Sequence, residues 1–215
     1  MLREWDTPTT GAGQILVKTE ACGACHTDYK GIKEAATKPG DWVVVSGVGG
    51  LGHLTIQYAK AMGLHLCALD INDGKLAHAR LMGADVTVNA KLPDAVKQVK
   101  KATRGGAHGV LITAPSLASL KQGVAITCKR GTGVLTGLLP GEFLFPVSDV
   151  VLNCITVRGS LVGIRQDMAD ALAFANEGKV KADIELQPLS AINQVLERLE
   201  RGEVAVRVVL DFASH

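Results

Sequence analysis

The chain has 215 residues, of which 47% are hydrophobic and 20% are charged, with 23 Lys and Arg residues against 21 Asp and Glu residues. This composition excludes general disorder and is typical of an α/β protein with a sizeable core. Because only 4% of the residues are aromatic and no dense basic stripe is present, we expect a small-molecule ligand and no nucleic acid.

The N-terminal residues predict no targeting or membrane segment. The opening MLREWDTPTTGAG lacks a basic stretch followed by an apolar one, and no run approaches about 18 uninterrupted apolar residues. We therefore expect a cytoplasmic protein with no membrane partner.

The residues before Asp41 differ in pattern from the rest of the chain. Gln14 to Glu20 alternates as a β-strand does, the cluster ACGACHTD follows, and Tyr29 to Thr37 has the period of a helix. Lys38, Pro39 and Gly40 then predict a turn. This segment is too short to form a core of its own.

From Asp41 onward, short β-branched runs alternate with segments of helical period. The predicted strands are Trp42 to Ser46, His65 to Asp70, Val86 to Asn89, Gly109 to Thr113 and Thr132 to Thr136. The predicted helices are Leu51 to Met62, Asp73 to Met82, Pro93 to Ala102 and Leu117 to Thr127. This alternation predicts the α/β class, with a doubly wound parallel sheet covered by helices on both faces.

After Pro140 the pattern loosens. Phe145 to Val151 leads into a strand predicted at Ile155 to Leu161, and a helix from Gln166 to Glu177 ends at a glycine. The last predicted elements are a strand at Ile184 to Leu186, a helix at Ala191 to Arg201 and a strand at Val204 to Phe212.

A glycine motif follows the first strand of the predicted sheet. Gly47, Gly49 and Gly52 have the spacing G-x-G-x-x-G, between a strand and a helix. In this context the first glycine permits a tight turn, the second lets the backbone approach a pyrophosphate, and the third allows close helix packing. The motif predicts a dinucleotide site; a glycine turn in an unrelated α/β fold is the alternative.

An acidic residue ends the next predicted strand. Asp70 stands where a carboxylate accepts hydrogen bonds from the adenosine ribose hydroxyls and repels a 2′-phosphate, which favours NAD over NADP. Lys75, on the first turn of the next predicted helix, is either a second ribose contact or an ordinary surface lysine.

The five cysteines are odd in number. Cys67, Cys128 and Cys154 stand singly within apolar patterns, so we expect buried thiols. Cys22, Cys25 and His26 form C-x-x-C-H, which is compatible with haem attachment, with a redox pair or with part of a zinc site. Each of these three needs residues beyond the motif.

The phrases ACGACHTD, KPGDWVVVSGVGGLGHLTIQYAKAMG, LDINDGKLAHARLMGAD, GSLVGIRQD and VRVVLDF together strongly resemble the zinc-dependent alcohol dehydrogenases of the medium-chain dehydrogenase/reductase superfamily. The resemblance covers nearly the whole chain and is most specific to the bacterial tetrameric type. It implies a Rossmann domain, NAD as cofactor and alcohol-to-aldehyde or alcohol-to-ketone hydride transfer assisted by zinc.

The resemblance also implies roles for single residues. Cys25 matches the first ligand of the catalytic zinc, His26 a catalytic position near the cofactor phosphates, and Thr27 the hydroxyl that relays the alcohol proton. The remaining matches are cofactor-binding positions in the glycine loop, near the pyrophosphate and around the nicotinamide: Gly50, Leu51, Arg207, Thr113, Leu138 and Val162.

This chain departs from the family pattern at one junction. Asp28 is joined directly to Tyr29, where family members place most of the catalytic domain, including the other zinc ligands and the structural zinc lobe. We therefore predict a catalytic-domain remnant at 1–28, a NAD-binding Rossmann domain at 29–165, and a return to the remnant at 166–215. The catalytic zinc site is expected to be incomplete and the structural zinc site absent.

Two functions follow from these observations. The first is a NAD-dependent oxidoreductase that takes a small alcohol or aldehyde as substrate, in shortened form. The second is a catalytically impaired NAD-binding remnant that forms oligomers. Val150 to Leu161 resembles the edge strand through which the family joins two sheets, so a homo-oligomer, a dimer or a tetramer, is expected in either case.

Overall fold

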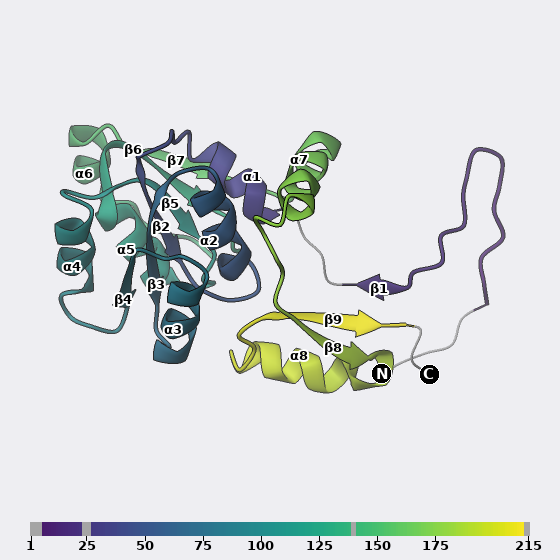
Figure 1. The fold of residues 1–215 in the computed structure, drawn as a ribbon. Helices are drawn as coiled ribbons and strands as arrows, with labels where there is room; N and C mark the ends of the chain where they lie inside the picture. Colours follow the sequence, from purple (N-terminus) through teal and green to yellow (C-terminus); the bar gives the residue numbers. More distant parts are fainter. Residues whose placement is uncertain (1–5, 23–26, 139–140, 213–215) are drawn as a thin grey trace. The chain divides into compact units, whose positions relative to one another are not determined.

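The computed structural model describes residues 6–22, 27–138 and 141–212. The chain divides into two compact units. We call Cys25–Ala182 the sheet unit, and Met1–Ala24 with Asp183–His215 the terminal unit. Both are drawn in Figure 1.

The sheet unit contains a parallel six-stranded sheet in the order β4-β3-β2-β5-β6-β7. Its strands are β2 (Trp42–Ser46), β3 (His65–Asp70), β4 (Val86–Asn89), β5 (Ala107–Ile112), β6 (Thr127–Leu135) and β7 (Thr156–Gly159). This order is that of a doubly wound Rossmann sheet, in which the chain turns back between the two central strands. The predicted fold class is therefore confirmed.

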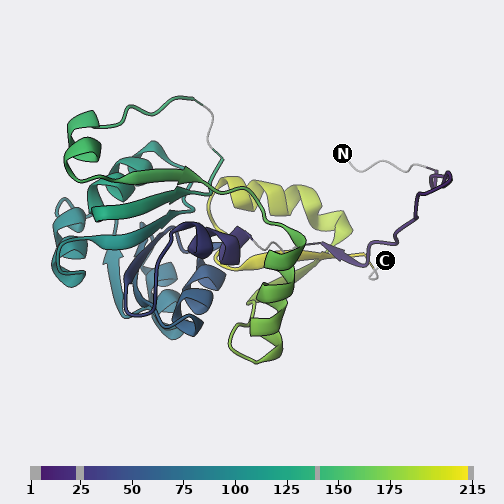
Figure 2. The ribbon, with the colours of Figure 1, turned by 90° about the horizontal axis from the view of Figure 1, so that it is seen from above.

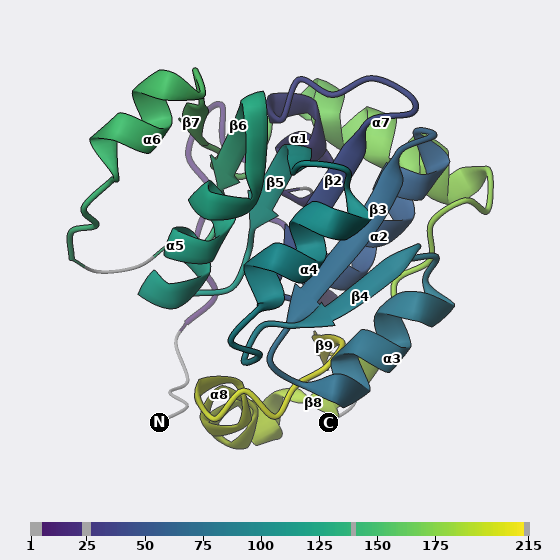
Figure 3. The same ribbon diagram turned by 90° about the vertical axis from the view of Figure 1, so that its left-hand side faces the viewer.

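Alternate residues of the central strands enter two separate cores, because successive side chains of a strand point to opposite faces. Val43 and Val45 pack into one core, whereas Val44 packs into the other. Helices α4 (Ala95–Ala102) and α5 (Leu117–Ile126) cover the second face, toward the viewer in Figure 3. A strand buried on both faces requires the continuous β-branched runs seen in the sequence.

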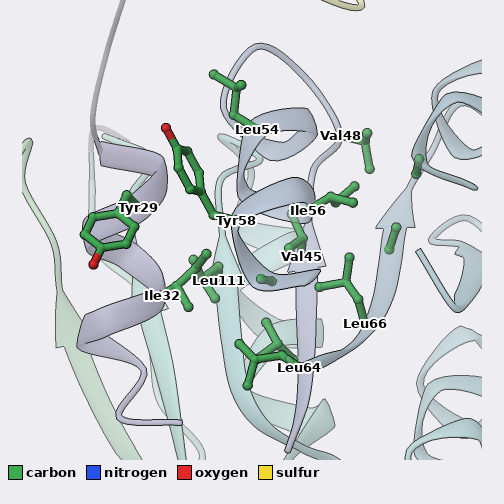
Figure 4. Packing of buried hydrophobic residues seen from close by; sticks show 14 of the residues in the cluster. Tyr29, Ile32, Val45, Val48, Leu54, Ile56, Tyr58, Leu64, Leu66 and Leu111 are labelled. Atoms are coloured by element: carbon green, nitrogen blue, oxygen red, sulfur yellow. The ribbon is translucent and has the colours of Figure 1, made fainter. Parts of the chain in front are cut away.

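Helices α1 (Thr27–Glu34), α2 (Gly52–Ala61) and α3 (Asp73–Leu81) cover the first face of the sheet. Figure 4 shows Tyr29 and Ile32 of α1 among the buried side chains that surround α2. The rings of Tyr29 and Tyr58 meet edge to face at 5.6 Å, and Ile32 is almost completely buried. These contacts fix α1 on the sheet unit.

Helix α7 (Arg165–Asn176) belongs to the sheet unit, so the boundary predicted after residue 165 is too early. Asp167 and Ala171 are buried, and Tyr58 Oη donates to the carbonyl of Ala171 at 3.3 Å. Figure 2 shows α7 beside α1. The first side of the sheet lacks enough apolar cover from α2 alone, and α1 with α7 supplies it.

The terminal unit has a three-stranded sheet in the order β1-β9-β8. Its elements are β1 (Ala21–Cys22), β8 (Ile184–Pro188), the 3-10 turn η1 (Leu189–Ala191), α8 (Ile192–Glu200) and β9 (Arg207–Asp211). The strand predicted at Gln14 to Glu20 is wrong. Only Ala21 and Cys22 pair with β9, and the preceding alternation lies exposed without strand structure.

Two further expectations from the sequence need correction. Helix α6 (Val147–Leu152), just before β7, was not predicted, because its apolar side chains are exposed and leave no one-sided pattern. Of the three cysteines expected to be buried, Cys67 is buried, Cys128 is half-buried and Cys154 is exposed. Cys154 lies in the turn between α6 and β7, with a φ of 50°. Within the described residues, every helix is too short or too polar to cross a membrane.

Candidate functional site

The carboxyl ends of the parallel strands meet at one edge of the sheet unit and form a cavity there. The cavity has a volume of about 480 Å³ and is lined by Ser46, Gly47, Asp70, Lys91, Ser116 and Gln122, among others. These residues end or follow β2, β3, β4 and β5. The cavity thus lies at the point where the strand order reverses, which is where open α/β sheets bind ligands.

The glycine loop between β2 and α2 forms one wall of the cavity. Gly47 has a φ of +104°, and a Cβ there would lie 2.7 Å from the backbone nitrogen of Ala114. A Cβ on Gly52 would overlap the carbonyl group of Gly47, whereas Gly49 faces open space. Gly50 and Leu51 complete the turn, and α2 begins at Gly52. Only glycines fit this tight turn, and it leaves room beside Gly49.

Asp70 connects the glycine loop to the end of β3. One carboxylate oxygen accepts a hydrogen bond from the backbone N–H of Val48 at 2.7 Å, and the other accepts from Asn72 N–H at 2.9 Å. The side chain of Asn72 in turn caps α3 by accepting from the backbone N–H of Lys75 at 3.2 Å. A carboxylate has about four acceptor positions. Asp70 can therefore hold the loop and still accept from a ligand in the cavity.

Two polar side chains brace the glycine loop from behind. The hydroxyl of Thr113, just after β5, donates to the carbonyl of Gly47 at 2.7 Å. The Nδ1 atom of His53, a fully buried residue on α2, lies 3.1 Å from the carbonyl of Gly49. The sequence had indicated only a structural or surface role for His53. The contact with the loop has no sequence signal beyond the position of His53 on the first turn of the helix.

The other predicted cofactor residues fall in two places. Leu138 and Val162 follow β6 and β7, so they share the carboxyl edge with the cavity. Leu138 is exposed, and Val162 has a φ of 45°. Arg207 is the first residue of β9, in the terminal unit, where its backbone N–H donates to Asp183. The structure therefore groups Leu138 and Val162 with the glycine loop and assigns Arg207 to a different unit.

The cysteine and histidine motif is divided by the described ranges. Cys22 lies in β1 of the terminal unit, Cys25 and His26 lie outside the described residues, and Thr27 is the first residue of α1. Across the parts of the chain that the structure describes, no group of three His, Cys, Asp or Glu side chains is placed to hold a metal ion.

Sequence reasoning missed much of the cavity wall. Gln122 donates to the carbonyl of Ala90 at 2.9 Å, and Ser116 caps α5 by accepting from Ser119 N–H at 3.1 Å. Together with Lys91, these residues line the side of the cavity opposite the glycine loop. The available signal was their place directly after β4 and β5, since every parallel strand ends at this edge.

Comparison with known proteins agrees with this geometry. A family model described as zinc-binding dehydrogenase matches residues 50–177. An alcohol dehydrogenase of Rhizobium meliloti (strain 1021) is 51% identical over 185 residues, which are 86% of this chain and 54% of that relative. The chain thus spans about half the length of the curated relatives it matches.

Solved structures give the same result. The crystal structure of the alcohol dehydrogenase from the archaeon Aeropyrum pernix has a TM-score of 0.81 and 37% identity, covering 87% of this chain and 55% of that one. The acetophenone reductase of Geotrichum candidum, solved in complex with NAD, has a TM-score of 0.76 and 27% identity, covering 88% of this chain and 54% of that one.

Proposed function

Because this chain belongs to the zinc-binding dehydrogenase family, we propose that it binds NAD at the carboxyl edge of its six-stranded sheet, for hydride exchange with a small alcohol or aldehyde. One observation carries the proposal. Asp70, the glycine loop and a cavity of about 480 Å³ lie together at the point where the strand order reverses. The relatives named as alcohol dehydrogenases and the relative solved with NAD support the cofactor and the reaction.

The residues present fit the adenosine half of this cofactor. Asp70 keeps acceptor positions for ribose hydroxyls, and its charge disfavours the 2′-phosphate of NADP. Lys75 begins the helix next to Asp70 and provides a second ribose contact. The open space at Gly49 and the free N–H groups at the start of α2 receive the pyrophosphate.

The second half of the sheet receives the nicotinamide. Thr113, Leu138 and Val162 follow β5, β6 and β7, so their backbone groups border the other end of the same edge. When bound there, NAD supplies the hydride acceptor for an alcohol carbon. The chain's own part is to orient the ring and keep one of its faces from water.

The metal belongs to the same proposal through Cys25, with His26 and Thr27 beside it. Those roles rest on the family resemblance alone. Because no three-residue metal group occurs in the described part of the chain, the steps proposed for the described residues are limited to binding and orienting the cofactor.

Fluorescence titration with NADH tests the proposal. We expect saturable binding to the chain and weaker binding of NADPH. A chain that binds neither nucleotide would contradict the function proposed.

A second candidate function is cofactor binding and assembly without turnover. The observation behind it is that α1 runs without interruption from Thr27 to Glu34, across the junction of Asp28 and Tyr29. The remainder of a catalytic domain is therefore not inserted at this point.

Zinc per chain after dialysis, measured beside NADH formation from ethanol with added zinc, separates the two candidates. Less than one zinc and a background rate favour the second. Stoichiometric zinc and a rate abolished by Cys25→Ser favour the first.

We also propose that the chain forms a homo-oligomer through β7. This strand ends the sheet order, and the exposed side chains of Val151, Leu152 and Leu161 lie just before and after it. An unpaired apolar edge of this kind is covered in native proteins by another strand or element.

A further inference from the structure

Val162 has a backbone conformation that valine rarely adopts. Its φ is 45°, in the left-handed region, where a β-branched side chain is an outlier. Such strain persists only where the surrounding contacts determine the backbone. The side chain of Val162 is 45% exposed, so its own packing does not account for the conformation.

Two hydrogen bonds flank Val162, one on each side, and both lead to helix α1. Before it, the carbonyl of Leu161 accepts from Lys30 Nζ at 3.3 Å. After it, the backbone N–H of Ile164 donates to Asp167 Oδ2 at 3.0 Å. The other oxygen of Asp167 accepts from Lys33 Nζ at 2.8 Å. Since residues three apart lie on one face of a helix, Lys30 and Lys33 act together on this loop.

Helix α1 is a firm support for these contacts. Tyr29 packs on Tyr58 of α2, and its hydroxyl donates to Asp170 of α7 at 3.3 Å. Glu34 pairs with Arg158 of β7 at 2.7 Å. The helix is therefore bound to the segments on both sides of the Val162 loop. Figure 4 shows its buried face toward α2.

The pair of Lys33 and Asp167 is charged at neutral pH. The N–H of Ile164 and the ammonium of Lys33 both lower the pKa of Asp167, whose side chain is only 6% exposed. The bond to Asp167 in turn raises the pKa of Lys33. Removing the lysine leaves a nearly buried carboxylate without its counter-ion, so the loop it holds should shift.

We propose that Lys33 and Asp167 are positioning residues for the nicotinamide half of the cofactor, because through Ile164 they hold the Val162 backbone at the carboxyl end of β7. This inference rests on the proposed function. A dinucleotide spans the two halves of such a sheet, so the half made of β5, β6 and β7 faces the nicotinamide. The neutral carboxamide on that ring needs donors and acceptors at fixed positions, which a rigid backbone supplies.

The chain offers a closely matched control pair. Lys60 Nζ lies 2.8 Å from Asp85 Oδ1, and Asp85 Oδ2 accepts from the backbone N–H of Leu66 at 2.7 Å. The chemistry is the same as in the Lys33 pair. Leu66, however, lies near the amino end of β3, at the edge of the sheet opposite the cavity.

Titration with NADH and with ADP-ribose, which lacks only the nicotinamide ring, tests the inference. In Lys33→Met we expect NADH affinity to fall about tenfold and ADP-ribose affinity to change less than about twofold, because only the ring end of the site is disturbed. Lys60→Met should leave both affinities unchanged. Lys33→Arg should restore NADH binding, since a guanidinium also pairs with Asp167.

The outcomes separate this inference from the proposed function. If the unchanged chain binds neither ligand, the proposed function is wrong. If the unchanged chain binds both, and Lys33→Met lowers the two affinities equally or not at all, the pair serves stability alone and the inference is overturned. Should Lys33→Met not fold, Lys30→Met removes only the bond to Leu161, and the same selective loss of NADH affinity is expected.

Discussion

The backbone N–H of Val48 donates a hydrogen bond of 2.7 Å to Asp70 Oδ2. A residue of the glycine loop and the acid at the end of the neighbouring strand are thus already joined without a ligand. The acid therefore has two effects on a bound dinucleotide. It supplies an acceptor to the ribose, and it holds the loop that the pyrophosphate approaches.

Replacing Asp70 should separate these two effects. In Asp70→Ala we expect NADH affinity to fall about tenfold to one hundredfold, because hydrogen bonds to a charged group contribute about 1.5–3 kcal/mol. Asp70→Asn keeps an acceptor for Val48 but removes the charge, so NADPH affinity should rise relative to NADH. Fluorescence titration of each variant measures both. Equal affinities for NADH and NADPH in the unchanged chain would remove Asp70 from this role.

The sequence predicted the sheet unit better than the rest of the chain. Strands β2, β3 and β4 have the predicted bounds, because a strand buried on both faces shows an uninterrupted apolar run between turn residues. The strand expected at Gln14 to Glu20 failed because alternation does not reveal whether a partner strand is present. Helix α7 was assigned to the wrong unit because its partners α1 and α2 are distant in sequence.

The same distinction applies to the candidate site. The glycine loop and Asp70 are readable because they occur in one strand-loop-helix-strand stretch. Lys91 and Gln122 come from separate connections, so only the strand order brings them to the cavity. The φ of 45° at Val162 has no sequence signal, because the residue that normally marks this conformation is glycine.

The cysteines should differ sharply in reactivity. Burial raises the pKa of the Cys67 thiol to about 12, so its thiolate fraction at pH 8 is about one in ten thousand. Cys154 is exposed. We expect Ellman's reagent to modify Cys154 in the folded chain and Cys67 only after denaturation, with peptide mapping to identify the sites. Rapid labelling of Cys67 without denaturant would show that β3 is not buried as described.

The stability of the sheet unit should depend on pH through Asp167. The backbone N–H of Ile164 and the ammonium of Lys33 lower its pKa in the folded chain. A lowered folded pKa stabilises above the unfolded value of about 3.9 and is lost as the pH falls toward the folded value. Urea unfolding should therefore show that Asp167→Asn lowers the free energy of unfolding at pH 7, with a difference that shrinks below about pH 4. A difference that grows on acidification would contradict the assignment.

Relieving the strain at Val162 should stabilise the chain. In Val162→Gly we expect the free energy of unfolding to rise by about 1 kcal/mol, because glycine adopts positive φ without steric cost and little buried surface is lost. Val151→Gly is the control, since Val151 is exposed on helix α6, where glycine should destabilise. Denaturant unfolding compares the two variants. Destabilisation by both would mean that the Val162 side chain makes contacts that outweigh the strain.

The edge strand β7 should mediate assembly. Ser160 N–H donates to Leu135 of β6, so the alternation of a strand turns the N–H groups of Val157 and Gly159 toward the open edge. Pairing of two such edges would satisfy these donors and cover the exposed Leu161. We expect at least a dimer by light scattering at micromolar concentration. Val157→Pro removes one outward donor without removing a bond to β6, and edge strands tolerate proline. This variant should be a monomer that still binds NADH, because the glycine loop and Asp70 lie on other strands. A monodisperse monomer of the unchanged chain, or an unaltered dimer of the variant, would show that β7 is not the interface.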